Sequence, residues 1–188
     1  LFTKYTGGRE LYQSTSPDGI TWTEDQKLVG FGGHYAASWG HGNKRGIMFN
    51  WHPPKGGLNA RTNLYYMETD DFGQTWKNIH GQQLTLPLDS PQNDALVYEY
   101  QKDGLLVYLK DLNFDENGHP FLLVVNSKGY ESGPENGPRI WRLIRWDGQK
   151  WNFSKVAQSD HNYDTGFINV ADDTWKIIGP TASGPQEY

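Results

Sequence analysis

The chain of 188 residues contains no cysteine, which excludes a fold held together by disulfide bonds. No apolar run approaches the roughly 18 residues that a membrane-spanning helix needs, and Leu1 does not open a signal-peptide pattern. Runs of like charge stay short and the net charge is −5, so neither nucleic acid nor a membrane surface is expected as a partner. Long helical periodicity is also missing. These absences leave a chain built mainly of strands and turns.

Aromatic residues and turn formers are abundant. Eight tryptophans and eleven tyrosines occur beside 22 glycines and 10 prolines. Such a composition favours short strands separated by turns, with large amphipathic side chains packing between them. The length suffices for one domain with a sizeable core. Six aromatic residues are expected to pack between neighbouring sheets: Trp39, Trp51, Tyr65, Tyr66, Trp141 and Trp175.

One stretch organises the chain, Thr-Asp-Asp-Phe-Gly-Gln-Thr-Trp at residues 69–76. It follows a segment whose β-branched and aromatic residues suit a strand. Asp71 can accept hydrogen bonds from backbone amides two residues on, and Gly73 can adopt a positive φ. We therefore expect the chain to reverse here and Trp76 to fold back onto the strand.

Two weaker versions of this stretch occur elsewhere in the chain. Residues 16–22 are one residue short of it, and a returning strand is expected around Trp22. Residues 146–151 keep only the Asp-Gly pair and the final tryptophan. Three units of strand, turn and tryptophan indicate one supersecondary motif used repeatedly.

A complete unit has the order strand, tight turn, strand, longer loop, strand, Asp-type turn, strand. In the middle of the chain this order predicts a fourth strand after Trp76, preceded by strands at residues 34–39, 45–51 and 61–68. The order repeats with strands at residues 105–112, 120–126, 139–145 and 151–156. It begins again at residues 165–171 and 175–178. Residues 94–100 form an extra strand with no assigned place.

Four-stranded antiparallel units of about 40–50 residues in series are the blades of a β-propeller. We therefore predict an all-β fold, a partial β-propeller of four-stranded antiparallel blades. It comprises the outer half of a blade, two blades and the inner half of another, at residues 1–29, 30–92, 93–158 and 159–188. Because propellers need about 4–8 blades to close, the remainder of a seven-bladed propeller is an expected partner.

The pattern Ser/Thr-x-Asp-x-Gly-x-Thr-Trp is the Asp-box, or BNR repeat, of sialidase-like propellers, and residues 69–76 match it at every position. Three further stretches narrow the resemblance, namely residues 32–35, 49–65 and 160–164. Together they resemble the BNR-4 group of propellers, which includes ulvan-lyase-type and rhamnosyl-glucuronate-type polysaccharide lyases and related α-L-rhamnosidases. The arginine triad of true sialidases is not evident, which argues against sialic acid chemistry.

Strand polarity predicts which side chains meet. Successive strands run antiparallel, so the start of a first strand, the end of a second and the start of a third share one end of a blade, opposite the Asp-type turns. In the middle of the chain this end holds His34, His52 and Arg61. Because the first strand is innermost, the group is expected near the propeller axis. Residues of the later blades at the same end are Tyr130, Arg139, His161, Tyr163 and Tyr188.

The predicted site is rich in histidine, tyrosine and arginine and poor in the paired carboxylates that a glycosidase of the usual type needs. A lyase acting on a uronic acid needs a cation to neutralise the sugar carboxylate, a base for the neighbouring proton and an acid for the leaving oxygen. Arginine pairs bidentately with carboxylates, and histidine and tyrosine can serve as base and acid. The inventory therefore favours β-elimination.

The resemblance implies the same roles. The catalytic candidates are His34, His52, Tyr130 and Tyr188, and the substrate-binding candidates are Arg61, Arg139, His161 and Tyr163. Assignment within each pair is open. Each residue also has a structural alternative, since a histidine beside aromatic rings can be a satisfied core group and an arginine at a strand start can be a solvated edge charge.

Two other functions stay open. The first is an α-L-rhamnosidase-type glycoside hydrolase acting on rhamnosyl-glucuronate, and the second is a non-catalytic propeller whose aromatic rings stack on sugars. His161 with Asp160 and Asp164 could hold a structural divalent metal, calcium or zinc, and no other cofactor is expected. The expected partner is an acidic polysaccharide or oligosaccharide, and the expected location is secreted, periplasmic or at the cell surface.

Overall fold

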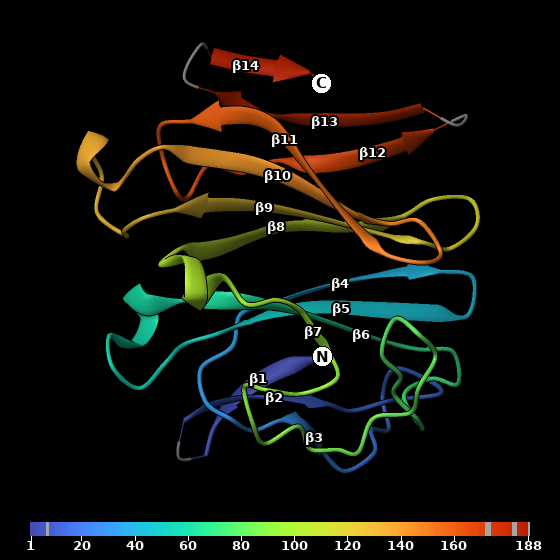
Figure 1. The fold of residues 1–188 in the computed structure, drawn as a ribbon. Helices are drawn as coiled ribbons and strands as arrows, with labels where there is room; N and C mark the ends of the chain where they lie inside the picture. The colour runs from blue at the N-terminus through green and yellow to red at the C-terminus, as the bar shows by residue number, and fades with distance from the viewer. Residues whose placement is uncertain (7, 172–173, 182–183, 188) are drawn as a thin grey trace.

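The computed structural model describes residues 1–6, 8–171, 174–181 and 184–187, with residues 181 and 184–187 described by their backbone alone. Its strands form four antiparallel sheets that lie side by side in chain order (Figure 1). Each sheet is a meander, because its strands pair in sequence order. This is how blades follow one another in a β-propeller, so the predicted fold class is confirmed. In the described part of the chain, no helix is long and apolar enough to cross a membrane.

The first sheet contains three strands, β1 (Phe2–Tyr5), β2 (Arg9–Gln13) and β3 (Gln26–Val29). The returning strand therefore begins four residues later than the expected strand around Trp22, and 60% of Trp22 is exposed. The shortened Asp-type turn closes on itself, because one carboxylate oxygen of Asp18 accepts the amide hydrogens of Ile20 and Thr21. Trp22 consequently does not fold back into the core.

The second sheet contains β4 (Ala36–His41), β5 (Lys44–Trp51), β6 (Thr62–Thr69) and β7 (Leu96–Tyr98). The 3₁₀ helix η1 (Gly57–Ala60) precedes β6. The predicted fourth strand directly after Trp76 is wrong, because only isolated bridges join Lys77 to Glu68 and Gln83. The long loop that follows runs beside β3 of the first sheet, where the Leu88 amide donates to the Leu28 carbonyl, before β7 pairs with β6. The unassigned strand within residues 94–100 therefore completes this blade, and the predicted blade boundary at residue 93 is wrong.

The third and fourth sheets follow the predicted order closely. The third contains β8 (Leu106–Phe114), β9 (Pro120–Ser127), β10 (Arg139–Trp146) and β11 (Trp151–Ser159). The short helices η2 (Tyr100–Asp103) and η3 (Pro134–Asn136) lie before β8 and β10. The fourth sheet contains β12 (Phe167–Ala171), β13 (Thr174–Thr181) and β14 (Gly184–Glu187), one strand more than expected.

Three buried clusters fill the spaces between successive sheets. Leu11 and Phe49 join the first two sheets, and Met48 and Leu122 belong to the cluster between the second and third. Of the six aromatic residues expected between the blades, three are buried, namely Tyr65, Tyr66 and Trp141. Trp51 is half-buried. The expectation is wrong for Trp39, which is 54% exposed, whereas Trp175 is 38% exposed but packs its ring against Phe121.

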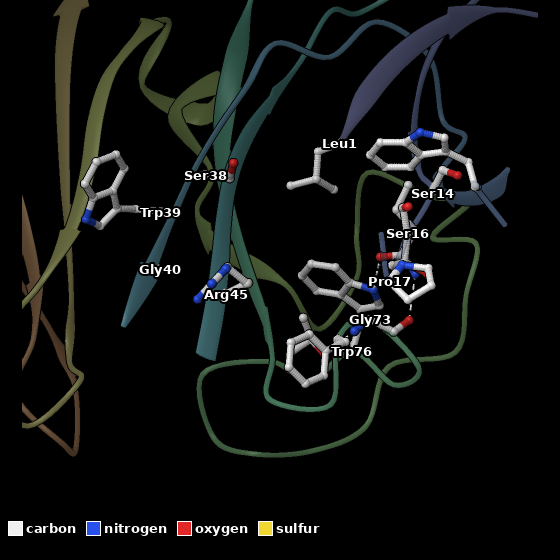
Figure 2. A pocket seen from close by; sticks show the side chains of 15 residues that line it. Leu1, Ser14, Ser16, Pro17, Ser38, Trp39, Gly40, Arg45, Gly73 and Trp76 are labelled. Carbon is white, nitrogen blue, oxygen red and sulfur yellow. Dashed lines mark hydrogen bonds between the residues drawn. The ribbon is translucent and has the colours of Figure 1, made fainter. Parts of the chain in front are cut away.

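A cavity of about 840 Å³ lies between the first and second sheets, at the end where the Asp-box turn lies (Figure 2). Trp22, Trp39 and Trp76 line it together with small polar side chains and Arg45. Its described lining contains no histidine, tyrosine or carboxylate. His34, His52 and Tyr130 therefore do not face this cavity.

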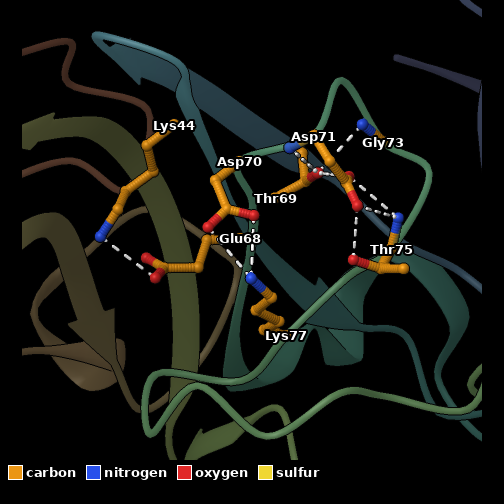
Figure 3. Close-up of polar contacts among 8 residues, drawn as sticks. All are labelled: Lys44, Glu68, Thr69, Asp70, Asp71, Gly73, Thr75 and Lys77. Atoms are coloured by element: carbon orange, nitrogen blue, oxygen red, sulfur yellow. Dashed lines mark hydrogen bonds and ion pairs between the residues drawn. The ribbon is translucent and has the colours of Figure 1, made fainter.

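The Asp-box turn is held by side-chain hydrogen bonds that replace backbone pairing (Figure 3). The Thr69 hydroxyl donates to Asp71 at 2.7 Å and accepts the Gly73 amide at 2.9 Å. Asp71 in turn accepts the amide and the hydroxyl of Thr75. The bonds from Thr75 and Thr69 hold the pKa of the Asp71 carboxyl well below its usual range. The amide that Asp71 caps lies four residues on, rather than the two expected for a simple Asx turn.

Trp76 folds back into the core as predicted and is 2% exposed. Its indole nitrogen donates to the side-chain oxygen of Gln13, and the side-chain nitrogen of Gln13 donates to the Gly73 carbonyl. Gly73 has φ of 85°, and a Cβ at this position would overlap with Gln13. The Asp-box therefore joins the first sheet to the second and has a structural role.

Replacing Thr69 with alanine is expected to lower the free energy of unfolding by about 1–2 kcal/mol, because it leaves the buried Gly73 amide without an acceptor. Urea unfolding followed by tryptophan fluorescence would measure the loss. Thr69→Ser is the matched control, since it keeps the hydroxyl and removes only a methyl group. Equal losses in the two variants would contradict the role given to the hydroxyl.

Candidate active site

Strand polarity brings three predicted site residues to the same end of the second sheet. His34 precedes β4, His52 follows β5 and Arg61 precedes β6, while the Asp-box turn lies at the opposite end. The backbone amide of His52 donates to the carbonyl of Gly33 at 2.7 Å, which places the two histidine segments side by side. The residues grouped by polarity in this blade are therefore neighbours in space.

Arg61 lies at the centre of the group. Its guanidinium carbon is 4.9 Å from the ring centre of Tyr35, 4.5 Å from that of Tyr108 and 5.6 Å from that of Tyr163. Its Nε donates to the carbonyl of Leu58 at 2.9 Å, and one terminal nitrogen lies 3.4 Å from the Tyr163 hydroxyl. Side chains from the second sheet, the third sheet and the loop before the fourth thus meet at one cation.

The backbone around Arg61 explains why it faces the third sheet. The Val107 amide donates to the Arg61 carbonyl at 3.1 Å, and the Thr62 hydroxyl donates to the Leu105 carbonyl at 2.8 Å. These two bonds join the start of β6 to the start of β8. Tyr108, the next residue along β8, consequently meets the guanidinium from the neighbouring blade.

The positive charge in this group lacks a carboxylate partner. Arg61 is only 7% exposed, yet neither it nor the nearby Arg9 forms an ion pair within the described residues. The Arg9 guanidinium lies 4.6 Å from the ring centre of Tyr35, on the ring that Arg61 also contacts. A desolvated cation is costly unless an anion or several acceptors compensate it. The arrangement is therefore suited to binding an anionic ligand.

His52 lies beside this charge as a neutral base. Its ring stands at 69° to the Tyr35 ring with 4.9 Å between centres, and neither ring nitrogen has a hydrogen-bond partner among the described residues. Burial, followed by the charges of Arg61 and Arg9, lowers the pKa of His52 to about 4. A Cβ on Gly33, whose φ is 69°, would overlap with the His52 side chain. Glycine at this position therefore makes room for the imidazole.

His34 occupies a different environment from His52. It is fully buried, with its ring edge-on to Phe31 and Phe49, and its Nδ1 lies 2.7 Å from the Asn50 carbonyl. Burial lowers the pKa of His34 to about 4. Its Nε2 is buried without a hydrogen-bond partner among the described residues, so the ring is not a fully satisfied core group. His34 has no exposed surface in this structure, and its catalytic role stays a prediction.

Tyr108 adds a second group capable of proton transfer. Its hydroxyl is buried without a hydrogen bond of normal length, alongside the amide of Asn162. Burial raises the pKa of Tyr108, so the phenol stays protonated at neutral pH. A neutral phenol beside a cation and a neutral imidazole can donate a proton to a leaving oxygen.

His161 and Tyr163 lie in the loop between β11 and β12. Their rings are 5.6 Å apart, and Tyr163 stacks edge-on against Tyr108 at 5.4 Å. His161 Nδ1 accepts the Tyr163 amide at 3.1 Å, and Asp164 accepts a hydrogen bond from Ser159. In the described ranges no three histidine, cysteine or acidic side chains are grouped to hold a metal ion. The metal at this loop stays a prediction.

Two further predicted residues, Tyr130 and Arg139, bond through their side chains to their own loop. Tyr130 is 46% exposed, and its hydroxyl donates to Glu131 at 3.2 Å. Arg139 is buried, and its guanidinium donates to the backbone carbonyls of Gly133 at 2.9 Å and Glu131 at 2.6 Å. Arg139 thereby holds its own loop and is not a solvated edge charge. Tyr188 lies outside the described residues.

Sequence reasoning missed Arg9, Tyr35 and Tyr108. Tyr35 follows His34 and directly precedes β4, and Tyr108 lies near the start of β8, so both lie by the innermost strands at the predicted end. Alternation along β8 places Tyr108 on the face that packs toward the fourth sheet and Val107 on the opposite face, but it does not show that Tyr108 meets Arg61 of another blade. No comparable signal distinguishes Arg9 from other strand residues.

Comparisons with known proteins identify related sequences. A family model described as a BNR repeat-containing family member matches residues 11–159. The chain is 28% identical over 174 residues to a protein named ulvan lyase from Nonlabens ulvanivorans, covering 78% of this chain and 35% of that protein. It is 23% identical over 128 residues to an ulvan lyase of Alteromonas sp. (strain LOR), covering 68% of this chain and 25% of that protein. The chain thus spans only about a quarter to a third of the length of these relatives.

Solved structures show the same fold. A structure described as an ulvan lyase of polysaccharide lyase family PL25 superposes with a TM-score of 0.72 at 19% identity, over 91% of this chain and 43% of that chain. A second structure of that kind, with the same scores, is bound to -[GlcA(1-4)Rha3S]-. At this identity the likeness establishes the propeller-like fold, and the chemistry has to be argued from the side chains.

Proposed function

The chain belongs to the BNR repeat-containing family, and we propose that it carries the active site of a polysaccharide lyase that cleaves a uronic-acid polysaccharide by β-elimination. The observation that supports this most is the Arg61 guanidinium held between Tyr35 and Tyr108 without a carboxylate partner in the described chain. A neutral imidazole and a neutral phenol lie beside it. These are the three groups that an elimination next to a carboxylate needs.

Each group has one step in the proposed reaction. Arg61 pairs with the sugar carboxylate and stabilises the charge that develops when the neighbouring C5–H bond breaks. A ring nitrogen of His52 takes that proton. The electron pair forms the C4–C5 double bond, the C4–O4 bond breaks, and the Tyr108 hydroxyl donates a proton to O4. Tyr108 takes the acid role here in place of Tyr130, whose hydroxyl pairs with Glu131.

The substrate that we propose is an acidic polysaccharide of glucuronate and sulfated rhamnose. Relatives are named ulvan lyases, and the related structure is bound to -[GlcA(1-4)Rha3S]-. Because such a polymer is degraded outside the cell, we also propose that the protein is secreted. Hydrolysis is less well supported, since a hydrolase of the usual type needs two carboxylates and, within the described residues, no carboxylate forms an ion pair with Arg61.

Product analysis tests the proposal directly. Incubation with the polysaccharide should release oligosaccharides with an unsaturated uronate at the new non-reducing end, seen as rising ultraviolet absorbance and confirmed by mass spectrometry. Hydrolysis would add water and give no such absorbance. Binding without turnover would instead favour the non-catalytic glycan-binding propeller.

The pH dependence of kcat/KM should reveal the neutral base. His52 acts as a base only when unprotonated, and because its pKa is lowered from 6.5 to about 4, kcat/KM should hold steady below pH 6.5 and fall as the pH drops through about 4. Initial rates across this pH range would measure the acid limb of the kcat/KM profile. Enzyme from each pH would be re-assayed at neutral pH to exclude unfolding. An acid limb centred near pH 6.5 would contradict the assignment.

A further inference from the structure

A second cation, Lys110, lies near the Tyr108 ring. Lys110 is two residues along β8 from Tyr108, and its Nζ is 5.9 Å from the ring centre of Tyr108 and 5.8 Å from that of Trp141. Arg61 is 4.5 Å from the same Tyr108 ring. A guanidinium and an ammonium thus both lie within about 6 Å of the ring centre of Tyr108, a residue of the innermost strand of the third sheet.

The surroundings of Lys110 leave its charge largely uncompensated. Nζ donates to the Asn162 carbonyl at 2.7 Å, which accounts for one of its three N–H donors. The charged groups acting on it are Asp164, from the loop before β12, and Arg61, from the start of β6. Asp164 accepts a hydrogen bond from Ser159 and forms no ion pair with Lys110 in the described structure.

The Lys110 ammonium lies in a partly desolvated place. Burial lowers the pKa of Lys110 to about 8, with Asp164 opposing and Arg61 reinforcing the shift. The ammonium thus remains mostly protonated at neutral pH, at a desolvation cost that an incoming anion would offset. The two N–H donors not used by Asn162 are available to such an anion.

We propose that Lys110 binds a sulfate ester on the sugar next to the uronate that Arg61 holds, and so determines specificity for the sulfated polymer. The proposal rests on the proposed lyase function. A planar guanidinium fits a carboxylate bidentately, whereas an ammonium acts as a compact point charge. Two different cations on one aromatic ring therefore match two different anionic groups on adjacent sugars, and Lys110 is a substrate-binding residue, separate from the proton-transfer groups.

The test compares the polymer of glucuronate and 3-sulfated rhamnose with the same polymer after chemical desulfation. In Lys110→Met, which keeps the unbranched stem, the ratio of kcat/KM for sulfated over desulfated polymer should fall about tenfold or more, mainly through KM for the sulfated form. Lys110→Arg, which keeps the charge, should retain most of the preference.

The pH dependence of the preference for sulfated polymer is a measurement that a purely structural role of Lys110 would leave unchanged. In the unmodified protein the preference for sulfated polymer should decline as the pH rises through about 8, because the ammonium loses its proton, and in Lys110→Arg it should persist. Equal losses on both polymers in Lys110→Met, or a preference independent of pH in the unmodified protein, would overturn the proposal. If the unmodified protein released no unsaturated product from either polymer, the lyase function itself would fail.

Discussion

Replacing His52 with alanine is expected to lower the rate of unsaturated-uronate formation about 10²- to 10⁴-fold, the usual contribution of a positioned general base. The side chain is 5% exposed, has no hydrogen-bond partner for either ring nitrogen in the described chain, and carries a pKa lowered to about 4. Initial rates on the acidic polymer, followed by ultraviolet absorbance, would measure the loss. His52→Gln should lose a similar factor, since glutamine keeps much of the volume but cannot take up the proton.

The fold should survive both His52 substitutions. Thermal unfolding of each variant, compared with the unmodified protein, would separate a lost base from a damaged core. The matched control is His80→Ala, because His80 is an exposed histidine of the loop beyond the Asp-box whose ring packs against Trp146. Near-normal product formation by a folded His52→Ala protein would remove His52 from the mechanism.

Replacing Arg61 with alanine is expected to lower kcat/KM about 10²- to 10³-fold, the loss typical when one group stabilising transition-state charge is removed. The reason is that, among the described residues, Arg61 is the guanidinium that contacts both Tyr35 and Tyr108, and the sugar carboxylate must be neutralised before the adjacent proton can be removed. Arg61→Lys should recover only part of the activity, because an ammonium cannot form the bidentate pair. Steady-state kinetics would give the factors, and added guanidinium ion should partly rescue Arg61→Ala.

Arg61 also packs against three tyrosine rings, so stability has to be followed together with activity. Arg45→Ala is the matched control, because Arg45 lies at the opposite end of the second sheet and donates to the backbone carbonyls of Gly42 and Lys44. Rescue by guanidinium would separate lost chemistry from lost packing. A folded Arg61→Ala protein with unchanged KM and kcat would contradict the carboxylate-binding role.

Local pattern decided much of the architecture correctly. The Asp-box at residues 69–76 fixed a turn, and its Trp76 is buried as predicted, because the spacing of threonine, aspartate and glycine is a local property. The fourth strand of that blade was misplaced, since β7 is separated from β6 by a long loop and pairs with it only in the folded sheet. The pattern of apolar residues in that loop does not show which strand β7 pairs with.

The sequence by itself determined the blade motif and, through strand polarity, that His34, His52 and Arg61 share one end of a sheet. Only the tertiary structure decided which of them is available for chemistry. Both rings are buried, but His34 packs between Phe31 and Phe49 with Nδ1 at the Asn50 carbonyl, whereas His52 lies beside the Arg61 charge with neither ring nitrogen paired in the described chain. The β6–β8 contact brings Tyr108 of one blade against Arg61 of another. Periodicity records which face of a strand a residue occupies, whereas burial and pairing between blades depend on the packing of segments far apart in the chain.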